Sequence, residues 1–497
     1  MWDSSDWHCT KDSLLYASEL RALLEFPGFD WRLSRENFVR FLANSYYGGT
    51  DSPIDGIFKL MPGTILEWDG TMPRLSTYWT SVPGEHGAKW YGTDNDALDE
   101  FESLLDLACA RSMRSDVPYG VFLSGGIDSS LVLDFCQRTN PDVASFAVAM
   151  SERDFDESSK SDVMQKYLDV RSHRRFTLTE ESVVDAMREV LDHMDEPHGD
   201  PGLVNAHFLS QSVRPHITVG IAGDGGDELF AGYALFKAVP AARILSRVPA
   251  VVPLLKAGLR LLPSSDTYMS LHFKVRAFLQ GFPATDALRL PQWLASTDLP
   301  SLAELCTNID PKRIHEPGFK KGIYADYASL DAELGPSTDI QKCLHFYQRI
   351  FLPEFVCMHT DRAAMLNSLE VRAPLLSPSL IEFANKLPDR MKMRGSRLKW
   401  LMSALARRRG YPDLITEQRK QGFTFPIARW LKTSLSPMTQ QLVLDPEWED
   451  DRLVAPDVVQ ALYEQHMSGS ANHYRTLYNL TVFRAWRRKF PNVAPPA

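Results

Sequence analysis

The chain has 497 residues, of which 44% are hydrophobic and 24% are charged, so neither a disordered chain nor a fibrous repeat is expected. Its 54 Lys and Arg residues against 63 Asp and Glu residues give a net charge of -9, which argues against a protein built to hold nucleic acid. The length exceeds one ordinary hydrophobic core and predicts roughly two to four domains.

The cysteines and the N-terminus indicate the compartment. The six cysteines form no CxxC pair and show no disulfide or zinc spacing, which fits a reducing environment. The opening residues, MWDSSDWHCTKDS, lack the apolar core of a signal peptide. The most apolar stretch, 248–262, contains Lys256 and Arg260 and is too short to cross a bilayer. We therefore expect a cytoplasmic protein without a membrane partner.

The first 82 residues alternate short apolar runs with turns, and Asp69-Gly70 is typical of a hairpin. So little chain predicts only a small β-rich unit. After a polar loop, apolar residues at helical spacing over 97–114 predict a helix near the start of a main domain, 94–497.

From Val117 to the run HITVGIA, short apolar runs alternate with helical segments. This alternation is typical of an α/β fold with a doubly wound parallel sheet, in which helices cover both faces. Ligands of such sheets bind at the carboxyl ends of the strands. The chain from Tyr233 onward has apolar residues at helical spacing and no alternating strand pattern, so it is expected to be mostly helical.

The first chemical motif is Leu123–Ser130 (LSGGIDSS), where an expected strand gives way to a helix. Gly125 and Gly126 allow the backbone to approach a ligand, and the helix N-terminus with its serine hydroxyls offers donors to phosphate. Asp128 would repel a bare phosphate, so it makes sense mainly as a Mg²⁺ ligand. The Walker A lysine is missing, so the usual P-loop transfer of a γ-phosphoryl group is not indicated. A capped glycine turn is the alternative.

The second motif is Gly223–Tyr233 (GDGGDELFAGY), directly after another apolar strand. The carboxylates of Asp224, Asp227 and Glu228 repel one another unless a cation compensates them. Asp227 could complete a Mg²⁺ site with Asp128 if both strands belong to one sheet. Taken alone, the string could equally be a solvated acidic turn.

Together the two strings resemble those of the asparagine synthetase family, whose ATP-pyrophosphatase domain carries SGGxDS and GDGxDELFxGY. Three more segments agree, at 195–201 (DEPHGDP), 361–376 (DRAAMLNSLEVRAPLL) and 419–431 (RKQGFTFPIARWL). The resemblance runs from about Leu14 almost to the C-terminus, with the motifs in family order.

The resemblance implies that ATP and Mg²⁺ activate the side-chain carboxylate of aspartate as β-aspartyl-AMP, releasing pyrophosphate, and that ammonia then gives asparagine and AMP. By matching position it also implies the binding residues: Leu123 and Val148 at the adenine, Ala222 and Gly223 as backbone contacts, Ser124, Gly125, Gly126, Asp128 and Ser129 around pyrophosphate, and Asp128 and Asp227 on Mg²⁺.

Three catalytic residues follow from the same resemblance. Asp224 matches an acidic residue important for the acyl-adenylate, where the related β-lactam synthetases have a tyrosine, so the acid favours amide synthesis over ring closure. Glu370 is the expected partner of Asp224, with an ion pair to Arg372 as the alternative. Lys420 matches the lysine before Gln-Gly-Phe and would stabilise developing negative charge.

Other basic residues give weaker evidence of a function. Lys399 and Arg394 could orient phosphates, although surface positions are commoner for such residues. The basic, aromatic segment 483–490 could suggest nucleic acid, but a helix that ends in cations explains it. We expect no nucleic-acid partner.

The N-terminal part departs from the family. A glutamine-dependent synthetase begins with a Cys whose free α-amine acts as a base, whereas Met1 is followed here by Trp2 and Cys9 is internal. We therefore expect residues 1–82 to be an incomplete glutaminase-like segment with an uncovered apolar surface. The candidates for that surface are Tyr46, Tyr47, Phe58, Leu60 and Ile65.

Several interpretations stay open at this point. Ser377 stands where the family commonly has Asp, which could alter the acceptor. The nitrogen could come from free ammonia, from glutamine through another chain, or from the substrate itself, as in β-lactam synthetases and lasso-peptide cyclases. A fragment of a glutamine-hydrolysing enzyme, a tRNA-modifying ATP-pyrophosphatase and a non-catalytic partner protein are further alternatives. A homodimer is possible.

Overall fold

The computed structural model describes residues 5–83, 90–152, 154–248, 250–259, 271–282, 286–307, 330, 332–334, 337–417 and 425–496. No helix in these ranges is long and apolar enough to cross a membrane.

A five-stranded parallel sheet forms the centre of the molecule, in the order β10-β9-β6-β7-β8. Its strands are β6 (Tyr119–Phe122), β7 (Ala144–Met150), β8 (His173–Leu178), β9 (Val219–Ile221) and β10 (Glu370–Arg372). The sheet confirms the predicted α/β fold. The sequence analysis missed β10, because three residues inside a helical region carry no periodic signal of their own.

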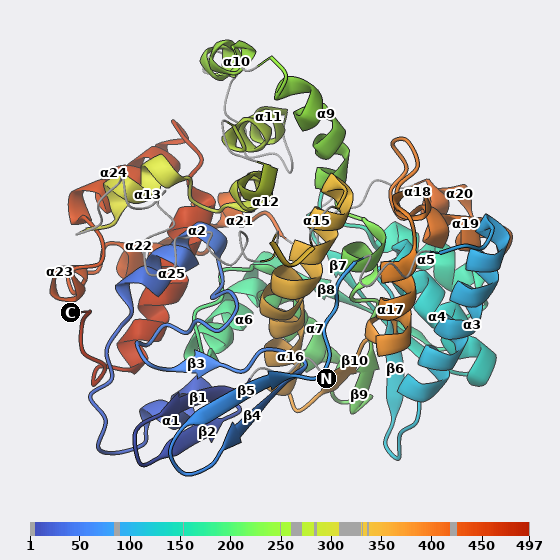
Figure 1. The fold of residues 1–497 in the computed structure, drawn as a ribbon, viewed down its shortest axis with the longest axis horizontal. Coiled ribbons are helices and arrows are strands. Elements are labelled where there is room, and N and C mark those ends of the chain that lie inside the picture. Colours follow the sequence, from blue (N-terminus) through green and yellow to red (C-terminus); the bar gives the residue numbers. More distant parts are fainter. Residues whose placement is uncertain are drawn as a thin grey trace.

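Helices cover both faces of the sheet (Figure 1). On one face α4 (Ile127–Thr139) contacts β6 and α5 (Ser158–Tyr167) contacts β7. On the other face α7 (Gly202–Val213) contacts β7 and β8. The expected helix near residue 97 is α3 (Asp94–Ser112), which begins at a capping box of Thr93 and Asp96 and packs on α4.

The chain after residue 226 is mostly helical, as predicted. Together with α6 (Glu180–His193), which precedes α7, its elements are α8 (Gly226–Phe230), η2 (Ala234–Lys237), α9 (Ala238–Leu245), α10 (Val251–Leu259), α11 (Leu271–Gln280), α12 (Asp286–Leu294), α13 (Leu299–Leu305), α15 (Asp339–Phe346), the π-helical η4 (Tyr347–Cys357), α16 (Met358–Met365), η5 (Pro374–Leu376), α17 (Pro378–Lys386), α18 (Asp389–Lys392), α19 (Trp400–Arg408), α20 (Asp413–Thr416), α21 (Ile427–Trp430), α22 (Ser436–Val443), α23 (Trp448–Asp451), α24 (Pro456–Ser468) and α25 (Tyr474–Lys489).

The N-terminal part is a small β-rich layer at the lower edge of Figure 1. One antiparallel sheet has the order β2-β1-β3, and β4 pairs with β5 in a hairpin that turns at Asp69-Gly70, as predicted. The elements are β1 (Asp6–Cys9), β2 (Leu14–Ala17), α1 (Leu20–Leu24), α2 (Arg35–Asn44), β3 (Phe58–Lys59), β4 (Thr64–Trp68) and β5 (Pro73–Thr77).

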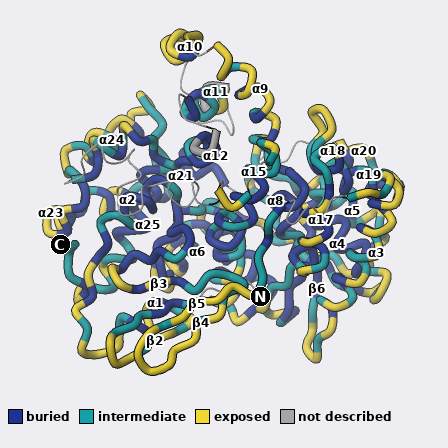
Figure 2. The backbone as a smooth tube through the Cα atoms, in the orientation of Figure 1, coloured by how far each residue is buried: buried dark blue, intermediate teal, exposed yellow. Residues whose placement is uncertain are grey.

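This layer is less exposed than the sequence analysis predicted. Phe58 and Ile65 are exposed and Leu60 is half-buried, but Tyr46 and Tyr47 are buried, so the expectation for these two tyrosines is wrong. The reason is that Tyr46 packs against Phe351 and Phe355 of η4 and Tyr47 stacks on Phe41 of α2, within a hydrophobic core that α2 shares with α25. In Figure 2 the buried path of α2 runs beside α25, whereas the hairpin lies at the exposed rim.

A buried ion cluster also ties the N-terminal layer to the main body. The ammonium of Lys59 contacts Glu354 at 2.5 Å and Glu196 at 3.2 Å, and it donates to the carbonyl of Tyr47 at 2.7 Å. Burial alone would lower the pKa of Lys59, but the two carboxylates outweigh it and raise that pKa. The domain boundary near residue 82 stays a prediction, and this cluster crosses it.

Candidate functional site

The first motif forms a tight loop between β6 and α4, which we call the phosphate loop (residues 123–130). Gly125 has a φ of +80°, and a Cβ there would lie 2.5 Å from the Cβ of Lys160, so the turn needs glycine. The Ser124 hydroxyl accepts a hydrogen bond from the Gly126 N–H at 3.3 Å. The N-cap of α4 is Gly126, which provides no side-chain cap, so the first N–H groups of the helix are left for an anion.

The second motif, which we call the acidic loop (residues 223–228), comprises the turn after β9 and the first residues of α8, and it touches the phosphate loop. A Cβ on Gly223 would lie 2.7 Å from the backbone nitrogen of Ser129, and a Cβ on Gly226 would lie 2.5 Å from Oδ1 of Asp128. The contact arises because β6 and β9 are neighbouring parallel strands, so their carboxyl ends meet. The predicted proximity of the two motifs is confirmed.

Asp128 and Asp227 converge on one cation, the ammonium of Lys399. The Lys399 nitrogen lies 2.5 Å from Oδ2 of Asp128 and 2.6 Å from Oδ1 of Asp227. The lysine side chain is only 11% exposed. The prediction of a surface position for Lys399 is therefore wrong, because the turn before α19 carries the residue inward against Gly232.

The two aspartates fit a divalent cation such as Mg²⁺. One cation already spans both carboxylates, and Oδ1 of Asp128 is buried without accepting a hydrogen bond from any residue that the structure describes. No group of three His, Cys, Asp or Glu side chains is arranged as a metal site in the described ranges. A pair of carboxylates suits Mg²⁺, which commonly takes one or two of them and completes its shell with water and phosphate oxygens.

The other carboxylates of the acidic loop differ from Asp227. Asp224 accepts a hydrogen bond from the Thr360 hydroxyl of α16 at 3.2 Å. Glu228 is fully buried, and burial raises its pKa to about 7 although the Tyr233 hydroxyl donates to it. Glu228 is therefore an internal residue of the acidic loop, whereas Asp224 is only half-buried.

The family follows from a comparison with known proteins. The family model described as asparagine synthase matches residues 100–488. The chain belongs to the asparagine synthase family. This membership supports an asparagine synthase-like ligase.

Three relatives from Bacillus subtilis (strain 168) are similar to this chain. Glutamine-hydrolyzing asparagine synthetase 1 is 24% identical over 494 residues, which cover 96% of this chain and 72% of the relative. Synthetase 3 is 22% identical over 455 residues, covering 85% of this chain and 64% of the relative. Synthetase 2 is 26% identical over 240 residues, covering 45% and 32%.

Glu370 pairs with Arg372 in the structure, and its expected pairing with Asp224 stays a prediction. The register of the central parallel sheet places Glu370 opposite Val219 at the start of β9, whereas Asp224 follows the end of that strand. The Glu370 side chain is 57% exposed and accepts a hydrogen bond from Arg372 at 2.7 Å. The alternative interpretation, a structural ion pair, is what the structure contains.

The remaining predicted residues lie as follows. Leu123, the first residue of the phosphate loop, is buried in the core, and its N–H donates to the Phe146 carbonyl at 2.7 Å. Val148 is half-buried in β7, and Ala222 donates from its N–H to the Arg372 carbonyl at 2.8 Å. Lys420 lies outside the described residues, so its place is not assigned.

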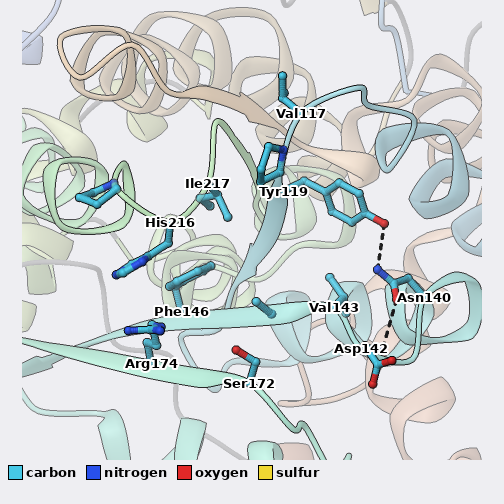
Figure 3. A pocket seen from close by; sticks show the side chains of 13 residues that line it. Val117, Tyr119, Asn140, Asp142, Val143, Phe146, Ser172, Arg174, His216 and Ile217 are labelled. Carbon is cyan, nitrogen blue, oxygen red and sulfur yellow. Dashed lines mark hydrogen bonds between the residues drawn. The ribbon is translucent and has the colours of Figure 1, made fainter.

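A cavity of about 540 Å³ opens at the amino-terminal ends of the sheet strands (Figure 3). It is lined by residues at the starts of β6, β7 and β8. There the side-chain amide of Asn140 donates to the Tyr119 hydroxyl at 3.0 Å, and its Oδ1 accepts from the Asp142 N–H at 3.1 Å. Because the phosphate and acidic loops follow the carboxyl ends of their strands, this cavity is separate from the candidate site.

Proposed function

We propose that this chain is an ATP-dependent carbon–nitrogen ligase that activates the side-chain carboxylate of aspartate as β-aspartyl-AMP and forms asparagine with ammonia. The observation that carries the proposal is the convergence of Asp128 and Asp227 beside the phosphate loop, on the edge of a parallel sheet where nucleotides bind. Membership of the asparagine synthase family supports the reaction class.

The phosphate loop would bind the triphosphate. The N–H groups at the start of α4 and the hydroxyls of Ser124 and Ser129 can donate to phosphate oxygens, and the helix dipole favours the negative charge. The adenine would lie near Leu123 and Val148, with backbone contacts from Ala222 and Gly223. Asp128 and Asp227 would hold Mg²⁺, which would supply charge neutralisation on the phosphates.

The proposed reaction has two steps, and in each of them one bond forms and one breaks. A carboxylate oxygen of aspartate bonds to the α-phosphorus of ATP, and the bond from that phosphorus to pyrophosphate breaks. The nitrogen of ammonia then bonds to the activated carbon, the bond from that carbon to the AMP oxygen breaks, and one proton is lost. Asp224, fixed by Thr360, would accept that proton. Lys420 would stabilise negative charge on the adenylate.

The nitrogen donor in this proposal is ammonia, supplied free or from glutamine through another chain. Cys9 cannot replace the N-terminal nucleophile of a glutaminase, because it is an internal residue of β1 and its Sγ contacts the Thr10 carbonyl at 3.2 Å. We also propose that the chain forms a homodimer.

The proposal is tested by pyrophosphate release from ATP and Mg²⁺ across a panel of carboxylates. Aspartate should give the fastest release, and Asp128→Asn should reduce it by about 100-fold or more because a preorganised charge is lost. Asp142→Asn is a matched control, since Asp142 pairs with Arg171 and is exposed away from the site. Faster release with another carboxylate would replace aspartate as the acceptor, and full activity of Asp128→Asn would overturn the metal assignment.

A further inference from the structure

We propose that Lys399 is a built-in competitor of the divalent cation, which holds Asp128 and Asp227 together and makes metal binding without nucleotide weak. The inference rests on the proposed function for the nature of the ligand, because it takes the site to be one for a divalent cation and an anionic nucleotide. Lys399 is thus a positioning residue for these two aspartates.

The contacts show that the ammonium takes the position a metal would need. It reaches both carboxylates at 2.5 and 2.6 Å, close to but longer than the roughly 2.0–2.1 Å of Mg²⁺–oxygen bonds. The ammonium thus stands where Mg²⁺ would have to contact both carboxylates, and the two cations cannot be there together. Binding of the metal requires the ammonium to withdraw from at least one carboxylate.

The surroundings are shaped for this lysine. A Cβ on Gly232 would lie 2.1 Å from Cε of Lys399 and 1.8 Å from Oδ1 of Asp227, so only glycine leaves room for the lysine stem. Lys399 itself has a φ of +48°, a left-handed conformation that is uncommon for a residue with a side chain. A side chain held in this way at a ligand site points to a role beyond surface charge.

The charges explain why bound nucleotide would favour the divalent cation over the Lys399 ammonium. The ammonium compensates part of the charge of the two aspartates, whereas a divalent cation between them compensates both and leaves the ammonium without these partners. A displaced ammonium is unfavourable in a partly buried site unless another anion pairs with it. Triphosphate at the neighbouring phosphate loop can accept the displaced ammonium, so nucleotide and metal should bind cooperatively.

The first test measures Mn²⁺ binding to the full chain without nucleotide, by electron paramagnetic resonance. Lys399→Met should bind Mn²⁺ at least about tenfold more tightly than the unmodified protein, a difference of about 1.4 kcal/mol. Lys160→Met is the matched control, because Lys160 is beside the phosphate loop but pairs with Glu157 instead of the two aspartates. Equal or weaker Mn²⁺ binding by folded Lys399→Met would overturn the proposal.

A second test needs no variant and keeps the proposal falsifiable if Lys399→Met fails to fold. Lysine acetylation of the unmodified protein is followed by mass spectrometry with and without saturating Mn²⁺. The metal should accelerate modification of Lys399 several-fold while leaving Lys160 unchanged. An unchanged or slower rate at Lys399 would contradict competition. Neither measurement depends on catalysis, so the result stands whether or not the chain forms an amide.

Discussion

Two buried lysines, Lys59 and Lys392, should respond in opposite ways to replacement by methionine. Lys59 is 1% exposed in its side chain and pairs with Glu196 and Glu354. Lys59→Met removes the cation and leaves two carboxylates buried, which should destabilise the fold by about 3–5 kcal/mol at neutral pH. The lost stability would weaken the contact between the N-terminal layer and the main body.

Lys392 at the end of α18 provides the matched control, because it is equally buried but its ammonium has no hydrogen-bond partner among the described residues. Burial lowers the pKa of Lys392 from 10.5 to about 8, with Asp389 opposing the effect in part. Such a fall corresponds to about 3 kcal/mol of lost stability at neutral pH. Lys392→Met should therefore be neutral or stabilising, by up to about that amount.

The pH dependence separates the two cases further. Burial raises the pKa of Glu354 to about 7, so protonation below that value favours the folded state. Without Lys59 this pKa must rise more, and the penalty of Lys59→Met should shrink between about pH 8 and pH 5. For Lys392 the folded-state pKa is depressed, so the cost is present below about pH 8 and disappears as the pH approaches 10.5.

Urea unfolding of the three proteins at about pH 8, 7 and 5 measures these effects. The reasoning is refuted if both variants shift the unfolding midpoint in the same direction, or if the Lys59→Met penalty grows toward pH 5.

Three further predictions concern the site and the N-terminal layer. Gly232→Ala should abolish binding of Mg²⁺–ATP in calorimetry, because its Cβ would meet Asp227 at 1.8 Å, whereas Gly258→Ala, with open space around it, should bind normally; retained affinity in Gly232→Ala would contradict the described packing. The purified chain should make product with ammonium and not with glutamine, and glutamate release matching AMP formation would refute this. Backbone amides of α2 should exchange slowly because its buried face packs on α25, and the β4–β5 hairpin should exchange faster; the reverse order would show that the shared core is not stable.

The parts of the site that the sequence predicted are local. Both glycine-rich strings follow apolar strands, and parallel strands bring their carboxyl ends to one edge, so the proximity of Asp128 and Asp227 could be deduced without coordinates. The family resemblance, carried by the same strings, is confirmed.

The parts that it did not predict depend on tertiary contacts. Lys399 lies in a basic, surface-like string, and only the packing of the turn against Gly232 brings it between the aspartates. The burial of Tyr46 and Tyr47 depends on a core shared with distant parts of the chain, such as Phe351 and Phe355 of η4. Glu370 was assigned from its motif, and its place in β10 opposite Val219 of β9 could not be deduced from a three-residue strand inside a helical region.

The central claim is that this chain activates a side-chain carboxylate by adenylation, and oxygen transfer tests it most directly. Aspartate labelled with ¹⁸O in its side-chain carboxylate is incubated with ATP, Mg²⁺ and ammonium, and the products are separated for mass spectrometry. If β-aspartyl-AMP forms, the bridging carboxylate oxygen leaves with AMP, so each asparagine formed should be matched by one AMP that carries one ¹⁸O. Label in inorganic phosphate together with ADP would show activation as an acyl phosphate, and it would contradict the account.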